Sequence, residues 1–232
     1  MVFFLDLLKM FLYNVSEIQY DPMAMQSVYY DTLLPEDVVN LMEKDLKVFD
    51  NNLEDSRVGG GENSSVEEKV RDAKNTWIPD THWSAGFIWH YVMKANRENF
   101  LYDIENIQGS TMQYTVYGEG QFYNWHQDLG LSAFYKPDVL PGQCDPQLNA
   151  TDFVIRNTER IRKLSFSLQL SDANEYEGGQ FQLLDEGGNI YTAPKKRGTL
   201  ILFDARASHR VRKVKTGTRK SIVGWIVGPR WK

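Results

Sequence analysis

Residues 32–49 and 86–100 carry apolar side chains at the three-to-four-residue spacing that is typical of amphipathic helices. In the first segment, TLLPEDVVNLMEKDLKVF, Val38 and Met42 fall on one face, and Pro35 stands near the first turn, where proline is tolerated. We therefore predict two helices in the first half of the chain.

The first residues, MVFFLDLLKMFLYN, form a shorter apolar run that Asp6 and Lys9 interrupt. It lacks the basic start and the small-residue cleavage site of a signal peptide, and it has about half the length that spans a bilayer. We interpret it as a short helix docked on the main body. An interfacial anchor and a self-association helix remain alternatives.

From about residue 110 the apolar period changes from helical spacing to two, the period of strands. Turn sequences such as GEG, EGGN and KTGT separate the short segments. The predicted strands cover 112–117, 122–128, 164–171, 180–184, 190–193, 199–204, 209–214 and 219–227. Eight short strands in a chain of this length predict a mainly β fold. We expect a double-stranded β-helix (jelly roll) with the N-terminal helices packed outside it.

We expect the whole chain, residues 1–232, to form a single domain, since one core of this size is common in β proteins. Residues 1–109 are predicted to be a mainly helical support region and residues 110–232 the jelly-roll core. Residues 132–160 interrupt the core with little periodicity, which is typical of a functional lid. This insertion either lines a groove for an extended, proline-containing peptide or excludes water above a small-molecule substrate.

Charge and cysteine content exclude some classes of protein. The formal net charge of −5 argues against nucleic acid as the main partner, because phosphate binding needs a basic surface. The single cysteine, Cys144, permits neither an internal disulfide nor a cysteine-based zinc site. Together with the missing signal peptide and membrane span, this favours a cytoplasmic protein.

The stretch YGEGQFYNWHQDLG places His126 and Asp128 two residues apart on a predicted strand, so that both point to one face. His209 begins a later strand and is the candidate third ligand. Two histidines and one carboxylate on one face leave open coordination positions and suit non-haem Fe(II). A cupin-like module that binds a metal without catalysis, and a zinc hydrolase, remain alternatives on these three residues.

Arg219 follows His209 by ten residues, on the strand that returns after the KTGT turn. This places a permanent cation inside the predicted barrel, and a buried guanidinium needs an anionic partner. A dicarboxylate co-substrate meets this need, because its keto-acid end can chelate the metal while its far carboxylate pairs with the arginine fork. A zinc hydrolase would leave Arg219 without a role.

The pattern Y-G-x-G-x-x-Y-x-x-H-x-D, followed by His209 and Arg219, resembles the Fe(II)/2-oxoglutarate oxygenases of the prolyl 4-hydroxylase branch, and within it the PKHD-type hydroxylases. The resemblance runs from about residue 28 to 232 and includes KVRDAKNTWIP and RKLSFSLQLSDANEYEGGQF. It implies Fe(II) as the metal, 2-oxoglutarate as the co-substrate and ascorbate as a candidate further ligand.

The resemblance also assigns roles to other residues of this chain. For the 2-oxoglutarate pocket it implies Arg219, Tyr117, Ser165 and Ser221. Near the metal or the substrate it implies Trp225, Tyr123 and Asn124. Packing alone is the alternative role for the aromatic residues, since any barrel core would bury such side chains.

The expected activity is hydroxylation of an unactivated carbon with dioxygen, on a prolyl residue of a peptide or protein. The alternative substrate is a free amino acid or another small metabolite. Related halogenases replace the carboxylate by a small residue, whereas Asp128 is present here. Nucleic-acid demethylases carry the 2-oxoglutarate arginine further beyond the second histidine, so that branch is disfavoured as well.

Overall fold

The computed structural model describes residues 28–30, 34–58, 65–128, 134–135, 160–185 and 187–231. Over these ranges the protein is mainly β, with two α-helices and with every strand pairing antiparallel. This confirms the predicted class of a mainly β protein with flanking helices. The N-terminal apolar run and most of the 132–160 insertion lie outside the described residues, so the expectations for them stay predictions.

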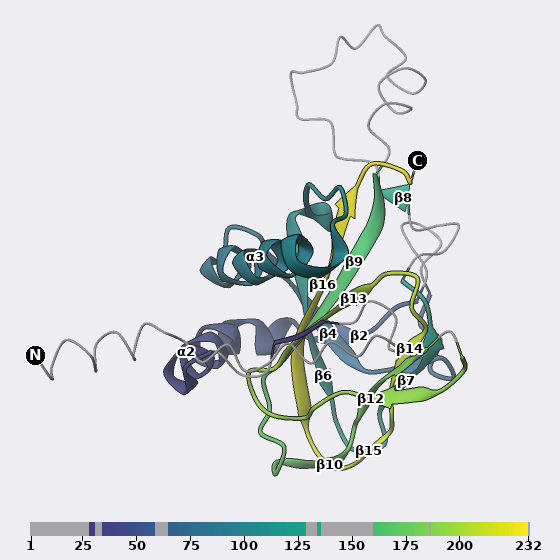
Figure 1. Cartoon of the computed structure of the whole chain (residues 1–232). Helices are drawn as coiled ribbons and strands as arrows, with labels where there is room; N and C mark the ends of the chain where they lie inside the picture. Colours follow the sequence, from purple (N-terminus) through teal and green to yellow (C-terminus); the bar gives the residue numbers. More distant parts are fainter. Residues whose placement is uncertain are drawn as a thin grey trace, which may run out of the picture.

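The larger sheet has nine strands. Its spatial order is β1 (Val28–Tyr30), β13 (Leu200–Asp204), β9 (Arg160–Gln169), β16 (Arg219–Gly228), β6 (Thr111–Tyr117), β4 (Lys74–Pro79) and β2 (Glu54–Asp55), with β5 (Asn106–Ile107) on β16 and β8 (Phe134–Tyr135) on β9. Strands far apart in the sequence are therefore neighbours (Figure 1).

The smaller sheet has five strands, in the order β12 (Ile190–Thr192), β11 (Phe181–Leu184), β14 (His209–Val211), β7 (Phe122–His126) and β3 (Arg71–Asp72). A separate two-stranded ladder joins β10 (Tyr176–Gly178) to β15 (Val214–Gly217). The segment predicted as one strand over 209–214 is thus divided between two sheets, because the chain leaves β14 after Val211 and pairs again from Val214.

The helices α2 (Glu36–Leu46) and α3 (Trp83–Ala95) cover one face of the larger sheet, away from β7 and β14 (Figure 1). Their apolar stripes, which include Met42 and Val92, pack against Leu164, Phe166 and Leu168 of β9 in one hydrophobic core. Shorter helical turns follow them at η1 (Lys47–Asn52), η3 (Asn96–Phe100) and η4 (Gln108–Ser110).

Strand β9 has two different buried faces, as its alternating sequence predicts. Leu164, Phe166 and Leu168 point to the helices, whereas the intervening Ser165, Ser167 and Gln169 point to the other side of the sheet and are also buried. A second core lies on that other side, where Phe181 and Val211 of the smaller sheet meet Tyr117 and Phe203 of the larger one. The polar face of β9 therefore lies inside the protein, where it must find polar partners.

The region before residue 110 contains strands that the sequence did not predict. Strand β4, KNTWIP, has no clear apolar alternation, but it pairs with β6 along its length and buries Thr76 and Ile78. Tertiary pairing thus outweighs a weak local pattern. Strand β9 also begins at Arg160, four residues before the predicted start.

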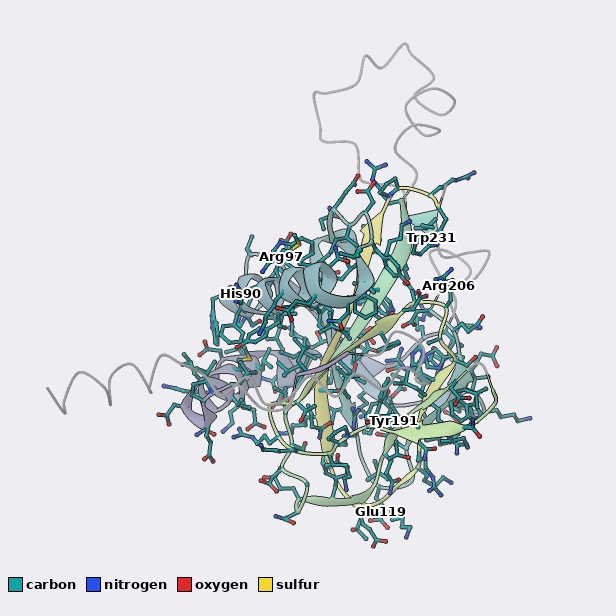
Figure 2. All side chains as sticks on the ribbon, in the orientation of Figure 1. His90, Arg97, Glu119, Tyr191, Arg206 and Trp231 are labelled. Carbon is teal, nitrogen blue, oxygen red and sulfur yellow. The ribbon has the colours of Figure 1, made fainter. Side chains whose placement is uncertain are left out.

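The C-terminal end is held by aromatic and cationic side chains. The ring of Trp231 lies 3.4 Å from Nζ of the buried Lys163, 4.6 Å from the Arg206 guanidinium and 4.7 Å from the Tyr102 ring. Figure 2 labels Trp231 and Arg206 beside one another. The hydroxyl of Tyr102 and the guanidinium of Arg206 donate hydrogen bonds to the buried carboxylate of Asp204.

None of the described helices has the length and apolar character that crossing a membrane requires.

We expect Gly224→Ala to destabilise the fold, because a Cβ at position 224 would lie 2.6 Å from ring atoms of the buried Phe166. Overpacking of this kind costs about 1–3 kcal/mol. Gly86→Ala in α3 is the matched control, since nothing lies within 4 Å of its added Cβ. Replacing a glycine inside a helix by alanine stabilises the folded state by about 0.5–1 kcal/mol. In denaturant titrations the unfolding midpoint should fall for Gly224→Ala and rise for Gly86→Ala, relative to the parent protein. A Gly224→Ala protein as stable as the parent would contradict this packing.

Candidate metal centre and co-substrate pocket

The pairing of β14 with β7 brings the candidate ligands together. His209 lies directly opposite His126 in this ladder, and their ring centroids are 4.1 Å apart. Asp128 follows β7, and its backbone N–H donates to the Ala205 carbonyl at 3.0 Å, which holds it beside the turn before β14. One ligand atom from each of the three residues lies within 4.8 Å of the others. This is the predicted cluster.

Both histidines are oriented by the backbone in the same way. Nδ1 of His126 lies 2.8 Å from the carbonyl oxygen of Asn124, and Nδ1 of His209 lies 3.0 Å from that of Ala207. Because each Nδ1–H donates to a carbonyl two residues earlier, each Nε2 keeps its lone pair as the ligand atom. The Nε2 atoms lie 3.9 Å and 3.4 Å from the Asp128 carboxylate.

The carboxylate of Asp128 is kept ionised. Burial raises its pKa, but the neighbouring His209, His126 and Arg162 and the hydrogen bond from Ser165 outweigh burial and lower the pKa to about 2. The Ser165 hydroxyl donates to Oδ2 at 2.6 Å. Burial and the adjacent His209 lower the pKa of His126 to about 3, so its imidazole is neutral. Metals bind these deprotonated forms.

Arg219 lies in the same cavity, which has a volume of about 670 Å³. The arginine is 2% exposed and faces Tyr117 across the β16–β6 ladder, with its guanidinium carbon 5.6 Å from the tyrosine ring centroid. Nη1 donates to the Ser221 hydroxyl at 3.1 Å. No carboxylate of the described chain lies within ion-pair distance, so the cavity holds a cation that still needs an anion.

The sequence did not identify three further polar residues of the cavity and its surroundings: Gln169, Tyr176 and Ser167. Gln169 donates to the Tyr176 hydroxyl at 3.0 Å, and Tyr176 is also hydrogen-bonded to Arg219. Ser167 lines the cavity, and its buried hydroxyl has no hydrogen-bond partner in the described chain. The signal for Gln169 and Ser167 was present in the polar positions of LSFSLQLS, which share one strand face.

Two of the remaining predicted residues, Ser165 and Asn124, lie away from the places that the sequence predicted for them. The Ser165 hydroxyl donates to Asp128. In the β9–β16 ladder, Ser165 lies opposite Trp225, whereas Gln169 lies opposite Ser221, two residues from Arg219. Four residues along a strand span about 13 Å, so Ser165 belongs to the metal end of the cavity and not to the arginine end. Asn124 is exposed and donates to the Lys69 carbonyl at 2.9 Å; it does not line the cavity.

Two aromatic residues predicted near the metal do line the cavity. The ring of Tyr123 stacks on that of His126, with centroids 3.5 Å apart and an interplanar angle of 16°. Trp225 lies beneath the Arg162 guanidinium at 4.1 Å and beside Trp77, with ring centroids 6.3 Å apart. Both therefore form walls of the site rather than filling a separate core.

The family model of the 2OG-Fe(II) oxygenase superfamily matches residues 112–227. A PKHD-type hydroxylase of Crocosphaera subtropica is 38% identical over 63 residues, which are 27% of this chain and 28% of that protein. Another, from Psychrobacter, is 30% identical over 113 residues, which are 49% of this chain and 36% of that protein. The matches therefore span between about a quarter and about a third of these relatives' length. The chain belongs to the 2OG-Fe(II) oxygenase superfamily, as the sequence predicted.

Solved structures share the fold. A prolyl-4-hydroxylase from Pseudomonas putida aligns with a TM-score of 0.60 at 18% identity, covering 89% of this chain and 94% of that one. A prolyl hydroxylase from Trichoplax adhaerens, in complex with a hypoxia inducible factor peptide fragment, aligns with a TM-score of 0.64 at 14% identity, covering 97% and 93%.

Membership of this superfamily implies Fe(II) and 2-oxoglutarate, and the side chains present fit both. Two imidazoles whose Nε2 atoms face one carboxylate on one side of a cavity are a ligand set for Fe(II) with positions left open. A buried arginine beside a tyrosine and a serine hydroxyl is a matching receptor for a distant carboxylate.

Proposed function

We propose that this protein is an Fe(II)- and 2-oxoglutarate-dependent dioxygenase that hydroxylates an unactivated carbon. One observation carries the proposal: the ligand atoms of His126, Asp128 and His209 share a cavity with Arg219, a buried cation that has no carboxylate partner in the described chain. A cupin-like binding module and a zinc hydrolase account for the three ligands, but they leave the arginine without a function.

Each part of the cavity has a task in this proposal. Bound Fe(II) and 2-oxoglutarate supply dioxygen activation coupled to oxidative decarboxylation. His126, Asp128 and His209 hold the metal, and Ser165 keeps the carboxylate in position through its hydrogen bond. Arg219, Ser221 and Tyr117 bind the far carboxylate of 2-oxoglutarate, with Tyr176 and Ser167 as further candidates.

We further infer that the two sheets form a jelly-roll core and that the chain folds as a single oxygenase domain. The antiparallel pairing of all described strands, the shared apolar core between the two sheets and the overlap with prolyl hydroxylase structures support this architecture. The helices α2 and α3 then act as the external support of the larger sheet.

For the substrate we propose a prolyl residue of a peptide or protein. The prolyl-4-hydroxylase of Pseudomonas putida and the peptide bound to the Trichoplax prolyl hydroxylase, both similar in fold, support this choice. The cavity also reaches the surface beside Trp77, which is 50% exposed and packs next to Trp225. Exposed aromatic side chains at a cavity mouth suit extended proline-containing segments.

We expect the protein with Fe(II), 2-oxoglutarate and dioxygen to release succinate, and to release it faster when a suitable proline-containing peptide is added. Succinate measurement tests the oxygenase class, because a binding module or a hydrolase produces none. Mass spectrometry of the peptide then checks for the added oxygen atom. Reactions without peptide and without iron are the controls.

The results of these assays test the oxygenase class and the peptide substrate independently. Absence of succinate under all conditions would overturn the oxygenase proposal. Succinate release coupled to a free amino acid or metabolite, with none on any proline-containing peptide, would overturn only the peptide substrate. The residues of the metal site would keep their proposed roles in that case.

A further inference from the structure

Arg71 is a second buried arginine in the cavity, and the oxygenase reaction as described does not use it. It lies on β3, is 6% exposed and lines the same cavity as the metal ligands. Its guanidinium carbon lies 4.7 Å from the Tyr123 ring centroid, on β7 next to the metal site. The same Tyr123 ring stacks on the His126 ring, with centroids 3.5 Å apart, so this cation lies close to the metal ligands.

The hydrogen bonds of Arg71 do not neutralise it. Nη2 donates to Oε1 of Gln113 at 2.7 Å, and Nη1 donates weakly to the Arg57 carbonyl at 3.5 Å. The buried Nε–H has no partner in the described chain. Both acceptors are neutral, so a buried charge and a free donor remain at the cavity wall, an arrangement that costs free energy until an anion binds.

Arg162, which is half-buried, approaches from the larger sheet and is attracted to the carboxylate of Asp128. Its Nε donates to Gln108 at 2.5 Å and its Nη1 to the backbone carbonyl of Asp128 at 3.1 Å, again neutral acceptors. Tyr123 lies within electrostatic reach of both arginines: burial raises the pKa of its phenol to about 12, and Arg71 and Arg162 oppose this rise. The two cations therefore flank one part of the cavity.

The charges in the cavity do not balance even with the co-substrate bound. Of the charged side chains in the described part of the chain that line the cavity and are not exposed, three are arginines, Arg71, Arg162 and Arg219, and one is a carboxylate, Asp128. Fe(II) and the 2-oxoglutarate dianion cancel one another. An excess of positive charge is left, and it lies on the arginines that the co-substrate does not contact. Glu54 and Asp55 at the rim are exposed and make no ion pair with Arg71 within the described residues.

We propose that Arg71, supported by Arg162, forms an anion subsite that binds a carboxylate of the substrate. This rests on the proposed function and narrows it to substrates with an acidic group close to the hydroxylated carbon. The carboxylate has two possible sources: an acidic side chain beside the prolyl residue in a peptide, or the free carboxylate of an amino acid. The fork of arginine matches either one.

Binding to the full chain loaded with Zn(II), as a redox-inert metal, and saturated with 2-oxoglutarate tests this subsite. The probes are matched pairs: N-acetylproline against N-acetylprolinamide, and a proline peptide with flanking glutamate against the same peptide with glutamine. NMR of the arginine Nε–H groups should show the Arg71 signal shifting with the carboxylate member of at least one pair. We expect that member to bind roughly tenfold or more tightly than its amide, since hydrogen bonds to charged groups are the stronger ones.

The variant Arg71→Gln should abolish this preference and leave 2-oxoglutarate binding unchanged. Arg57→Gln is the matched control, because Arg57 also lines the cavity but is exposed; it should keep the preference. If no carboxylate shifts the Arg71 signal in the parent protein, or if Arg71→Gln retains the preference, the subsite does not exist. The first comparison needs no variant. Failure of Zn(II) and 2-oxoglutarate to bind would instead overturn the proposed function, and the two failures are therefore distinguishable.

Discussion

An Asp128→Ala variant should lose Fe(II) binding and all hydroxylase turnover. Asp128 supplies the only carboxylate of the three-residue cluster, and its charge offsets part of the charge of the metal. Replacing groups that merely orient metal ligands already costs roughly 10–100-fold in affinity, so losing this ligand should cost at least about 100-fold. Anaerobic calorimetry with Fe(II) measures the affinity directly.

Thermal unfolding gives a second measurement that does not depend on activity. A metal that binds only the folded state raises the melting temperature, so Fe(II) or Mn(II) should raise the Tm of the parent protein and leave that of Asp128→Ala unchanged. Asp80→Ala is the control, because Asp80 is an exposed carboxylate outside the cavity. Near-normal turnover of Asp128→Ala would refute the assignment of the metal site.

Replacing Arg219 by leucine should raise the KM for 2-oxoglutarate by roughly tenfold or more, since a charge-assisted hydrogen bond is worth about 1.5–3 kcal/mol. Arg219→Lys keeps the charge but loses the two-pronged geometry, so we expect its KM to rise before kcat falls. Calorimetric titration of 2-oxoglutarate into the metal-loaded variants separates binding from chemistry.

The neighbouring Lys220 provides the control for this experiment. It lies next to Arg219 on β16, so its side chain points to the opposite face of the strand, and Lys220→Leu removes one positive charge without entering the cavity. We expect its affinity for 2-oxoglutarate to match that of the parent. An Arg219→Leu protein with unchanged 2-oxoglutarate affinity would exclude this arginine as the co-substrate receptor.

Much of the fold was accessible from the sequence because its signals are local. Helical spacing in α2 and α3 and the period of two from residue 111 onward follow from how side chains alternate around a helix or across a strand. Strand β4 was missed, because its pairing with β6, and not its own pattern, makes it a strand. The family was also recognisable, since the histidine, aspartate and arginine spacing is carried by short strands and tight turns.

The sequence by itself determined that His126 and Asp128 lie two residues apart and that Arg219 begins a strand ten residues after His209. The predicted return of the His209 strand through KTGT was wrong, because β14 pairs with β11 and β7, residues 214–217 pair with β10 as β15, and β16 pairs with β6 and β9. Only the tertiary structure decided which distant side chains meet. The register of β14 against β7 sets His209 opposite His126, and the register of β9 places Ser165 at Asp128 and not at Arg219. Arg71 stands in the segment KVRDAKNTWIP that carries the family resemblance, but no local pattern predicted its burial. That burial, without a carboxylate partner among the described residues, results from the packing of β3 beside the cavity. Contacts of this kind depend on the strand order and core packing of the whole domain, which no local pattern of residues encodes.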